Sequence, residues 1–284
     1  MRNEMIIGID MGGTKISAGV VHQNTVENSF SKKFNANGNV EDVLKELFSV
    51  TDQLINNRIA AIGIGIPGLA LNGMAYDVYN IPSWKEVPLQ HLMEQRYKVP
   101  VFVNNDSNCF ALGEFYFGKG KEYNSMVGLT LGTGLGTGII INRKLHSGKA
   151  CSAGEFGMIP YLDNYYEYYA SGQFFQNSYK LDGETVFMNA QNKDEASLKM
   201  YEEFGKHLGN ALKTILYALD PPIIIMGGSV TKAYPYFEKS MWQQIETIEL
   251  KRCLQGFSIE ISELQNSAIL GAAAICYDIN ELNK

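Results

Sequence analysis

IIGIDMGGTKISAGVV, residues 6–21, is repeated in pattern by VGLTLGTGLGTGIIIN, residues 127–142. In each segment an apolar run ends in a polar residue (Asp10 or Thr130), a glycine-rich turn follows, and a second apolar run comes next. This pattern predicts a β-hairpin with glycines at its tip. Because the two segments lie roughly one domain apart, we expect two related halves that face a cleft.

Strand and helix patterns alternate along the rest of the chain. A β-branched run at 60–66 and the apolar run at 223–226 read as buried strands. Apolar residues at helical spacing predict a long helix over 196–219, which Asp220-Pro-Pro222 ends. The alternation predicts an α/β architecture.

Composition excludes several classes of protein. With 284 residues, 45% of them hydrophobic, the chain can bury a sizeable core. Its 24 basic and 30 acidic residues give a net charge of -6 without a basic block, which argues against a nucleic-acid ligand. We expect no signal peptide and no membrane span. The four cysteines are widely scattered, which is typical of reduced thiols in a cytoplasmic protein.

The two glycine turns can bind an anion. Glycines let the backbone point N–H groups at a phosphate, and the threonines and lysine add hydroxyls and a charge. Two such turns can clamp successive phosphates of a nucleotide; the alternative is a pair of plain hairpin turns. The second turn fits neither the dinucleotide fingerprint, because Thr137 takes its last glycine position, nor the P-loop. The predicted nucleotide contacts are Gly12, Gly13, Thr14, Lys15, Gly132, Thr133 and Gly134.

Asp10 ends a predicted buried strand, where an unpaired carboxylate is costly. Magnesium keeps its waters and is shared between a carboxylate and phosphates, so we expect Asp10 to hold Mg²⁺ through water. The alternative is an aspartate that caps its own turn.

Six motifs follow one another along the chain: IIGIDMGGTK, GIPG (65–68), NNDSN, LGTGLGTG, GEFG (154–157) and IIIMGGS (223–229). Together, and in this order, they resemble the motifs of the ROK sugar kinases, within the actin-like, hexokinase-like ATPase superfamily, and they cover nearly the whole chain. The resemblance implies two actin-like (ribonuclease H-like) α/β domains flanking a cleft. The expected N-terminal domain is 1–112 with a helix at about 266–284, and the C-terminal, nucleotide-side domain is 113–265.

The resemblance also assigns the reacting groups. It implies that Asp106 is the general base for the attacking sugar hydroxyl and that Asn105 binds a neighbouring hydroxyl. Phosphoryl transfer depends on positioning, so a carboxylate must lie beside that hydroxyl. An alternative for this stretch is helix capping; both hold if Ser107 or Asn108 caps while Asp106 reacts.

Further binding residues follow from the resemblance. Glu155 and Glu167 match the sugar-binding glutamates, and Asn80-Ile-Pro-Ser-Trp84 resembles a loop that closes over the sugar. For Trp84 itself, ordinary core packing is the expectation. The remaining candidates are Gly65, Pro67 and Gly68 at the sugar, and Gly227, Gly228 and Ser229 at the ribose or adenine, or in a plain strand-to-helix turn.

Between Glu155 and Glu167 the chain departs from the family. The usual histidine is Met158 here, and MIPYLDNYYEYY contains no cysteine or histidine. Zinc without such donors is implausible, so we predict no zinc site. Packing of Tyr165, Tyr166, Tyr168 and Tyr169 is expected to brace this loop instead. His207 is expected to be a satisfied imidazole at the edge of the core.

The expected protein is therefore an ATP- and Mg²⁺-dependent hexose kinase that phosphorylates the 6-hydroxyl of glucose or a relative. N-acetylglucosamine or N-acetylmannosamine are alternative substrates. A sugar-sensing regulator is a further alternative, although Asp10 lies too near the N-terminus for a preceding DNA-binding domain. The resemblance suggests a homodimer.

Overall fold

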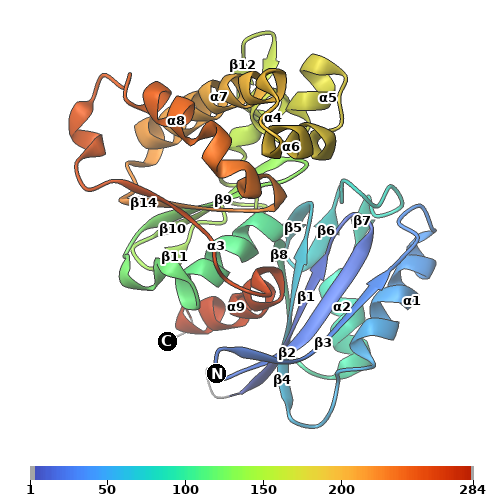
Figure 1. Cartoon of the computed structure of the whole chain (residues 1–284). Helices are drawn as coiled ribbons and strands as arrows, with labels where there is room; N and C mark the ends of the chain where they lie inside the picture. The colour runs from blue at the N-terminus through green and yellow to red at the C-terminus, as the bar shows by residue number, and fades with distance from the viewer. Residues whose placement is uncertain (1–3, 283–284) are drawn as a thin grey trace. The chain divides into compact units, whose positions relative to one another are not determined.

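The computed structural model describes residues 4–282. Contacts between residues divide the chain into two compact units (Figure 1). The first unit contains 1–124, 138–153 and 263–284, and the second contains 125–137 and 154–262. Both units are mixed α/β, as the alternating pattern predicts.

The first unit is built on a five-stranded sheet of order β3-β2-β1-β4-β8. β1 and β2 form the predicted hairpin, in which Asp10 pairs with Ser17, and β1, β4 and β8 run parallel. β1 and β4 are apolar and buried along nearly their whole length, which is typical of parallel strands covered on both faces. The strands are β1 (Met5–Met11), β2 (Lys15–His22), β3 (Thr25–Lys33), β4 (Ile59–Ile66) and β8 (Val101–Asn105).

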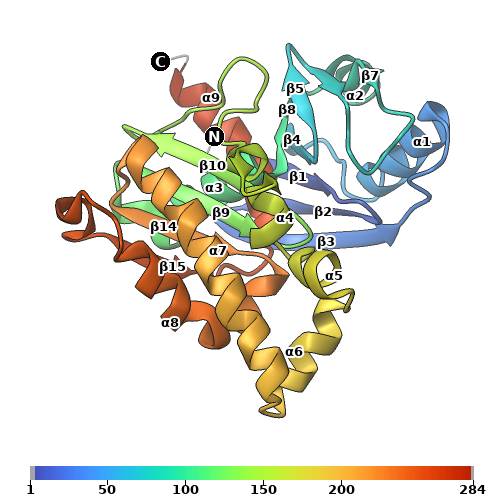
Figure 2. The ribbon, with the colours of Figure 1, turned by 90° about the horizontal axis from the view of Figure 1, so that it is seen from above.

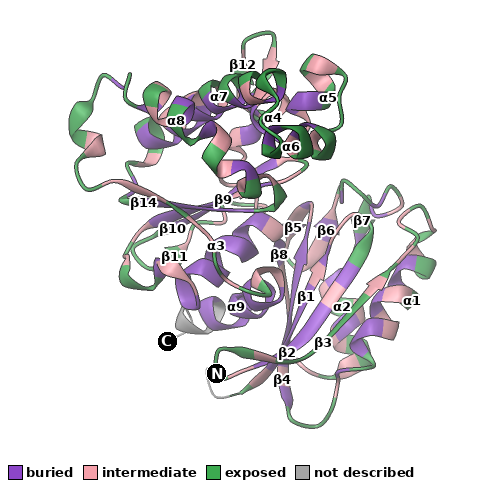
Figure 3. Ribbon diagram, in the orientation of Figure 1, coloured by how far each residue is buried: buried purple, intermediate pink, exposed green. Residues whose placement is uncertain are grey.

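Four helices belong to this unit: α1 (Val40–Thr51), α2 (Leu89–Tyr97), α3 (Asp106–Tyr116) and α9 (Ser267–Leu282). Figure 3 shows α3 as almost wholly buried. A small sheet, β5 (Leu69–Leu71), β6 (Met74–Tyr76) and β7 (Glu86–Val87), and a 3₁₀ turn, η1 (Lys119–Glu122), complete it.

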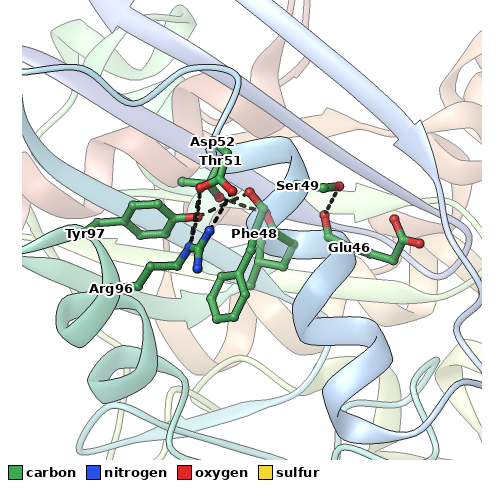
Figure 4. Close-up of polar contacts among 8 residues, drawn as sticks. Glu46, Phe48, Ser49, Thr51, Asp52, Arg96 and Tyr97 are labelled. Carbon is green, nitrogen blue, oxygen red and sulfur yellow. Dashed lines mark hydrogen bonds and ion pairs between the residues drawn. The ribbon is translucent and has the colours of Figure 1, made fainter.

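A polar cluster ties α1 to α2 (Figure 4). Arg96 Nη2 lies 2.7 Å from Asp52 Oδ2, and the Tyr97 hydroxyl donates to Asp52 Oδ1 at 2.8 Å. The Arg96 guanidinium also lies 4.8 Å from the ring centroid of Phe48. Because Asp52 and Arg96 are exposed, the ion pair contributes only modestly to stability. The cluster mainly fixes the end of α1 against the end of α2.

The second five-stranded sheet has the order β11-β10-β9-β14-β15. Its strands β9, β14 and β15 and the start of β10 belong to the second unit, whereas β10 from residue 138 onward and β11 group with the first. The strands are β9 (Met126–Leu131), β10 (Leu135–Ile141), β11 (Lys144–Leu145), β14 (Ile223–Gly227) and β15 (Ser258–Ile261). The helices are α4 (Tyr166–Ala170), α5 (Phe174–Tyr179), α6 (Gly183–Gln191), α7 (Glu195–Leu219) and α8 (Tyr234–Ile245). The shorter elements are η2 (Phe156–Met158), β12 (Pro160–Tyr161), β13 (Asn164–Tyr165), η3 (Ser229–Ala233) and η4 (Lys251–Leu254).

The core of the second unit is aromatic. α7, the long helix that the sequence predicts, lies beside α8 (Figure 2). The ring of Phe204, on α7, packs against those of Phe174 and Phe237, and all three are fully buried. No helix within the described residues is long and apolar enough to cross a membrane.

The division into units differs from the predicted boundaries. A boundary after residue 112 would cut α3, whose whole length packs on α9, and the contacts place the division after Asn124 instead. Residues 138–153 group with the first unit because they pack on α3: Asn108 Nδ2 donates to the Cys151 carbonyl at 3.1 Å. Of the predicted C-terminal helix, residues 283–284 lie outside the described residues.

Candidate active site

The polar stretch after β8 begins α3. The Asn105 side chain caps the helix, accepting N–H bonds from Ser107 at 2.9 Å and Asn108 at 3.3 Å. The alternative in which Ser107 or Asn108 caps does not hold, because both lie inside the helix and the cap is the residue before it. Asn105 Nδ2 donates to the Gly68 carbonyl at 3.3 Å, so both ends of this amide have protein partners.

Asp106 is the first residue of α3 and keeps part of its surface exposed. Burial raises its pKa, and hydrogen bonds from Ser107 partly oppose that rise. Such a carboxylate is accessible and more basic than usual, as a general base near neutral pH requires. Cys109, one turn further on, is a buried filler whose pKa burial raises well above its usual value.

Asp10 lies at the same edge of the sheet as Asp106. It pairs with Gly65 on β4, and Gly65 pairs with Asn104 on β8, two residues before Asp106. Burial and the charge of Asp106 raise the pKa of Asp10 to about 6, and Lys15 acts in the opposite sense. The negative charges of Asp10 and Asp106 disfavour one another, and a hydrated cation beside Asp10 would offset that repulsion. Asp10 therefore fits the predicted role of holding Mg²⁺ through water.

The first glycine turn and the predicted sugar loop meet. The Gly12 N–H donates to the Lys15 carbonyl at 3.0 Å, which closes the turn, and Thr14 and Lys15 are exposed. A Cβ on Gly13 would lie 2.8 Å from the side chain of Asn80, so only a glycine at this position leaves room for the asparagine side chain.

The loop that carries Asn80 is anchored on both sides. The Pro67 carbonyl accepts from the N–H of Tyr79 at 3.0 Å, and a Cβ on Gly68 would lie 2.9 Å from Val78. A Cβ on Gly65 would lie 3.1 Å from Cys109 Sγ, so Gly65 admits α3. Trp84 is fully buried, as core packing predicts.

The second glycine turn is held by Glu167. Its Oε2 accepts from the N–H of Leu135 at 3.0 Å, and a Cβ on Gly134 would lie 2.5 Å from that oxygen. Ser171 and Gln173 both donate to the Thr133 carbonyl, at 2.9 and 3.0 Å. Glu155, half-buried, precedes η2 and accepts the Met158 N–H through its carbonyl at 3.1 Å.

A cavity of about 630 Å³ opens in the second unit beside this turn. Gly132, Thr133 and Ser229 line it, whereas Gly227, buried in β14, and Gly228, exposed with φ of 99°, do not. Its other walls were not predicted, because they come from segments far apart in sequence. They include Gln173, Phe175, Asp182, Glu184, Tyr201 and Lys232.

The segment that lacks zinc donors is held by aromatic contacts. All four tyrosines make ring contacts, as the prediction of aromatic packing requires: Tyr166 with Tyr161, Tyr169 with His207, and Tyr168 with both Tyr169 and the 36% exposed Tyr165. The central ring is Tyr161, which the sequence analysis missed although MIPYLDNYYEYY contains it. No group of three or more His, Cys, Asp or Glu side chains within residues 4–282 lies close enough to hold a metal ion. The absence of zinc stays a prediction.

Two α/β units, each with a glycine-tipped hairpin, define the fold of the actin-like ATPases. The chain belongs to the ROK family, whose model matches residues 6–279.

Relatives within the family differ in their named functions. The glucokinase of Streptomyces coelicolor is 30% identical over 80% of this chain and 82% of its own. The N-acetyl-D-glucosamine kinase of Histophilus somni is 29% identical over 80% of this chain and 84% of its own. The xylose repressor of Bacillus subtilis is 28% identical over 78% of this chain and 62% of its own. The ROK glucokinase of Streptomyces griseus, solved with glucose and AMPPNP, has a TM-score of 0.80 at 26% identity, covering 95% of this chain and 98% of that one.

Proposed function

We propose that this ATP-dependent sugar kinase of the ROK family transfers the γ-phosphate of ATP to the 6-hydroxyl of glucose or a related hexose. The observation that carries the proposal is the partly exposed, raised-pKa carboxylate of Asp106 at the start of α3, beside Asp10. Asp106 accepts the proton of the attacking hydroxyl, and Asn105, Glu155, Glu167 and Asn80 orient the sugar.

The second unit offers a site for the nucleoside. Its cavity of about 630 Å³ lies within the usual range for small-molecule sites, roughly 300–1,000 Å³. Asp182 and Glu184 supply acceptors for ribose or base hydrogens, and Thr133 and Ser229 supply hydroxyls. Mg²⁺ at Asp10 neutralises phosphate charge when bound. The first-unit residues 12–15 stay predicted phosphate contacts.

Asp106→Asn tests the proposal. The substitution keeps the shape of the side chain and removes the base, so kcat should fall about 10²- to 10⁴-fold with little change in hexose affinity. An ADP-release assay gives kcat, and calorimetry gives the affinity. Asp42→Asn, at an exposed aspartate in the first turn of α1, serves as the control. Near-normal turnover of Asp106→Asn would contradict the assignment.

N-acetylglucosamine or N-acetylmannosamine is the alternative substrate, favoured by the kinase from Histophilus somni. Comparing kcat/KM across a panel of hexoses separates the candidates, because a site built for one set of polar groups rejects analogues that leave them unpaired. A regulator would instead bind a hexose without releasing ADP. A homodimer, which light scattering would detect, remains part of the proposal.

A further inference from the structure

A short hairpin connects the two proposed sugar-binding glutamates. Glu155 precedes η2, the strands β12 and β13 follow, and Glu167 lies in α4. The Tyr166 N–H donates to the Ile159 carbonyl at 3.1 Å and closes the segment at its base. Since α4 has only five residues, it has little stability of its own and takes its orientation from its neighbours.

One face of α7 supplies those neighbours. His207, Asn210 and Thr214 are spaced three and four residues apart, so they share one side of the helix. Asn210 Nδ2 donates to the Tyr161 hydroxyl at 2.9 Å, and that hydroxyl lies 3.1 Å from His207 Nδ1. The hydroxyl of Tyr166 lies 2.8 Å from Thr214 Oγ1.

The bonds from His207, Asn210 and Thr214 to the hydroxyls of Tyr161 and Tyr166 form a ladder along α7, called the α7 ladder below. Asn210 Nδ2 can only donate, so the Tyr161 oxygen accepts from it, and the bond between the same hydroxyl and His207 Nδ1 takes its direction from the tautomer of the imidazole. The second nitrogen of His207 lies 3.6 Å from Glu203. Asn210 Oδ1 in turn accepts from Gln244 of α8 at 2.8 Å. The chain of bonds therefore anchors Tyr161 to the two long helices.

The ring of Tyr161 restrains the position of α4 by packing on it. The ring stacks on Tyr166, with centroids 4.5 Å apart and planes 20° apart. Tyr166 immediately precedes Glu167, whose carboxylate accepts the N–H of Leu135 in the glycine turn. A displacement of the Tyr161 ring would therefore act on Tyr166, the residue next to Glu167.

We propose that Tyr161 is a positioning residue for hexose recognition: the α7 ladder fixes Tyr161 and Tyr166, and thereby the direction in which α4 presents the Glu167 carboxylate. The inference rests on the proposed function in one respect, the contact of Glu167 with the sugar. Hexose affinity depends on the precise placement of the Glu167 carboxylate, because small displacements weaken directional hydrogen bonds.

Tyr161→Phe tests the inference, because it keeps the stacked ring and removes only the hydroxyl. We expect the KM for hexose to rise about tenfold, as for one lost hydrogen bond, while the KM for ATP and kcat stay within about twofold. Amide exchange in peptides covering 133–136 and 166–170 should quicken about tenfold. Tyr165→Phe, in the same hairpin but 36% exposed, is the matched control and should leave all of these values unchanged.

The outcomes separate the two proposals. If the unmodified protein phosphorylates no hexose, the proposed function fails, but the exchange measurement still tests the ladder because it needs no substrate. Unchanged exchange and unchanged KM in Tyr161→Phe would overturn the inference. A lower melting temperature with neither effect would also overturn it, since it would reveal a role in stability alone.

Discussion

At the scale of single residues, Asp10 is held at a cost in stability. Burial and the nearby charge of Asp106 raise its pKa to about 6, from the ordinary value of 3.8 for an aspartate. A carboxyl group whose pKa is raised on folding stabilises the fold least when it is ionised. Stability is therefore highest below pH 3.8 as far as this group is concerned, and falls as the pH rises through about 6.

Asp10→Asn should stabilise the protein in the absence of nucleotide and divalent cations. The expected gain is roughly 1–3 kcal/mol at pH 8, allowing for the partial exposure of the carboxylate, and it should shrink toward zero as the pH approaches 4. Urea unfolding at several pH values with EDTA present measures it. Asp42→Asn should show no such gain; an equal gain at every pH would exclude ionisation of Asp10 as the cause.

At the scale of elements, α9 approaches the first sheet through glycines. A Cβ on Gly8 of β1 would lie 2.0 Å from the Ile269 carbonyl oxygen, and one on Gly63 of β4 would lie 2.0 Å from that of Ala272. Gly271 of α9 meets the backbone of Cys109 in α3 in the same way. These contacts place α9 close to both the sheet and the helix that begins with Asp106.

Gly63→Ala should therefore destabilise the first unit by about 1–3 kcal/mol or more, because backbone and not a flexible side chain occupies the space. Thermal unfolding would show the loss. Gly38→Ala, in the loop before α1, is the control, since its Cβ would meet nothing closer than 3.2 Å. Equal melting temperatures for the two variants would show that α9 can move away at little cost.

At the scale of the whole molecule, each unit carries its own hairpin and its own core. In the second unit, aromatic packing and the α7 ladder hold residues 158–169. That this segment binds no zinc stays a prediction.

Mild chelation should leave activity intact. With Mg²⁺ in excess, a zinc-selective chelator is expected to change the hexose-dependent release of ADP by less than about twofold, because residues 158–169 offer neither thiol nor imidazole. The assay is run before and after chelation. Loss of activity that returns when Zn²⁺ is added back would contradict the zinc-free prediction.

Local patterns predicted much of the fold and of the site. Two apolar runs joined by a glycine-rich turn specified each hairpin, and the apolar period of 196–219 specified α7 almost to the residue. The cap at Asn105 was missed because several adjacent side chains were chemically able to cap. The role of Tyr161 was missed because the segment contains several tyrosines, and nothing in the neighbouring sequence indicates which of them contacts α7.

The sequence by itself determined the strand and helix order, the α/β class and the ROK family, because these follow from periodicity, turn chemistry and ordered motifs. Only the tertiary structure decided which groups lie together: Asp10 and Asp106 at one sheet edge, where their charges interact, Glu167 with the Leu135 N–H, and Tyr161 with Asn210 and His207. The members of these pairs are up to 96 positions apart in the sequence, as Asp10 and Asp106 are. Local preferences carry no information at that range, and packing of whole elements sets the distances.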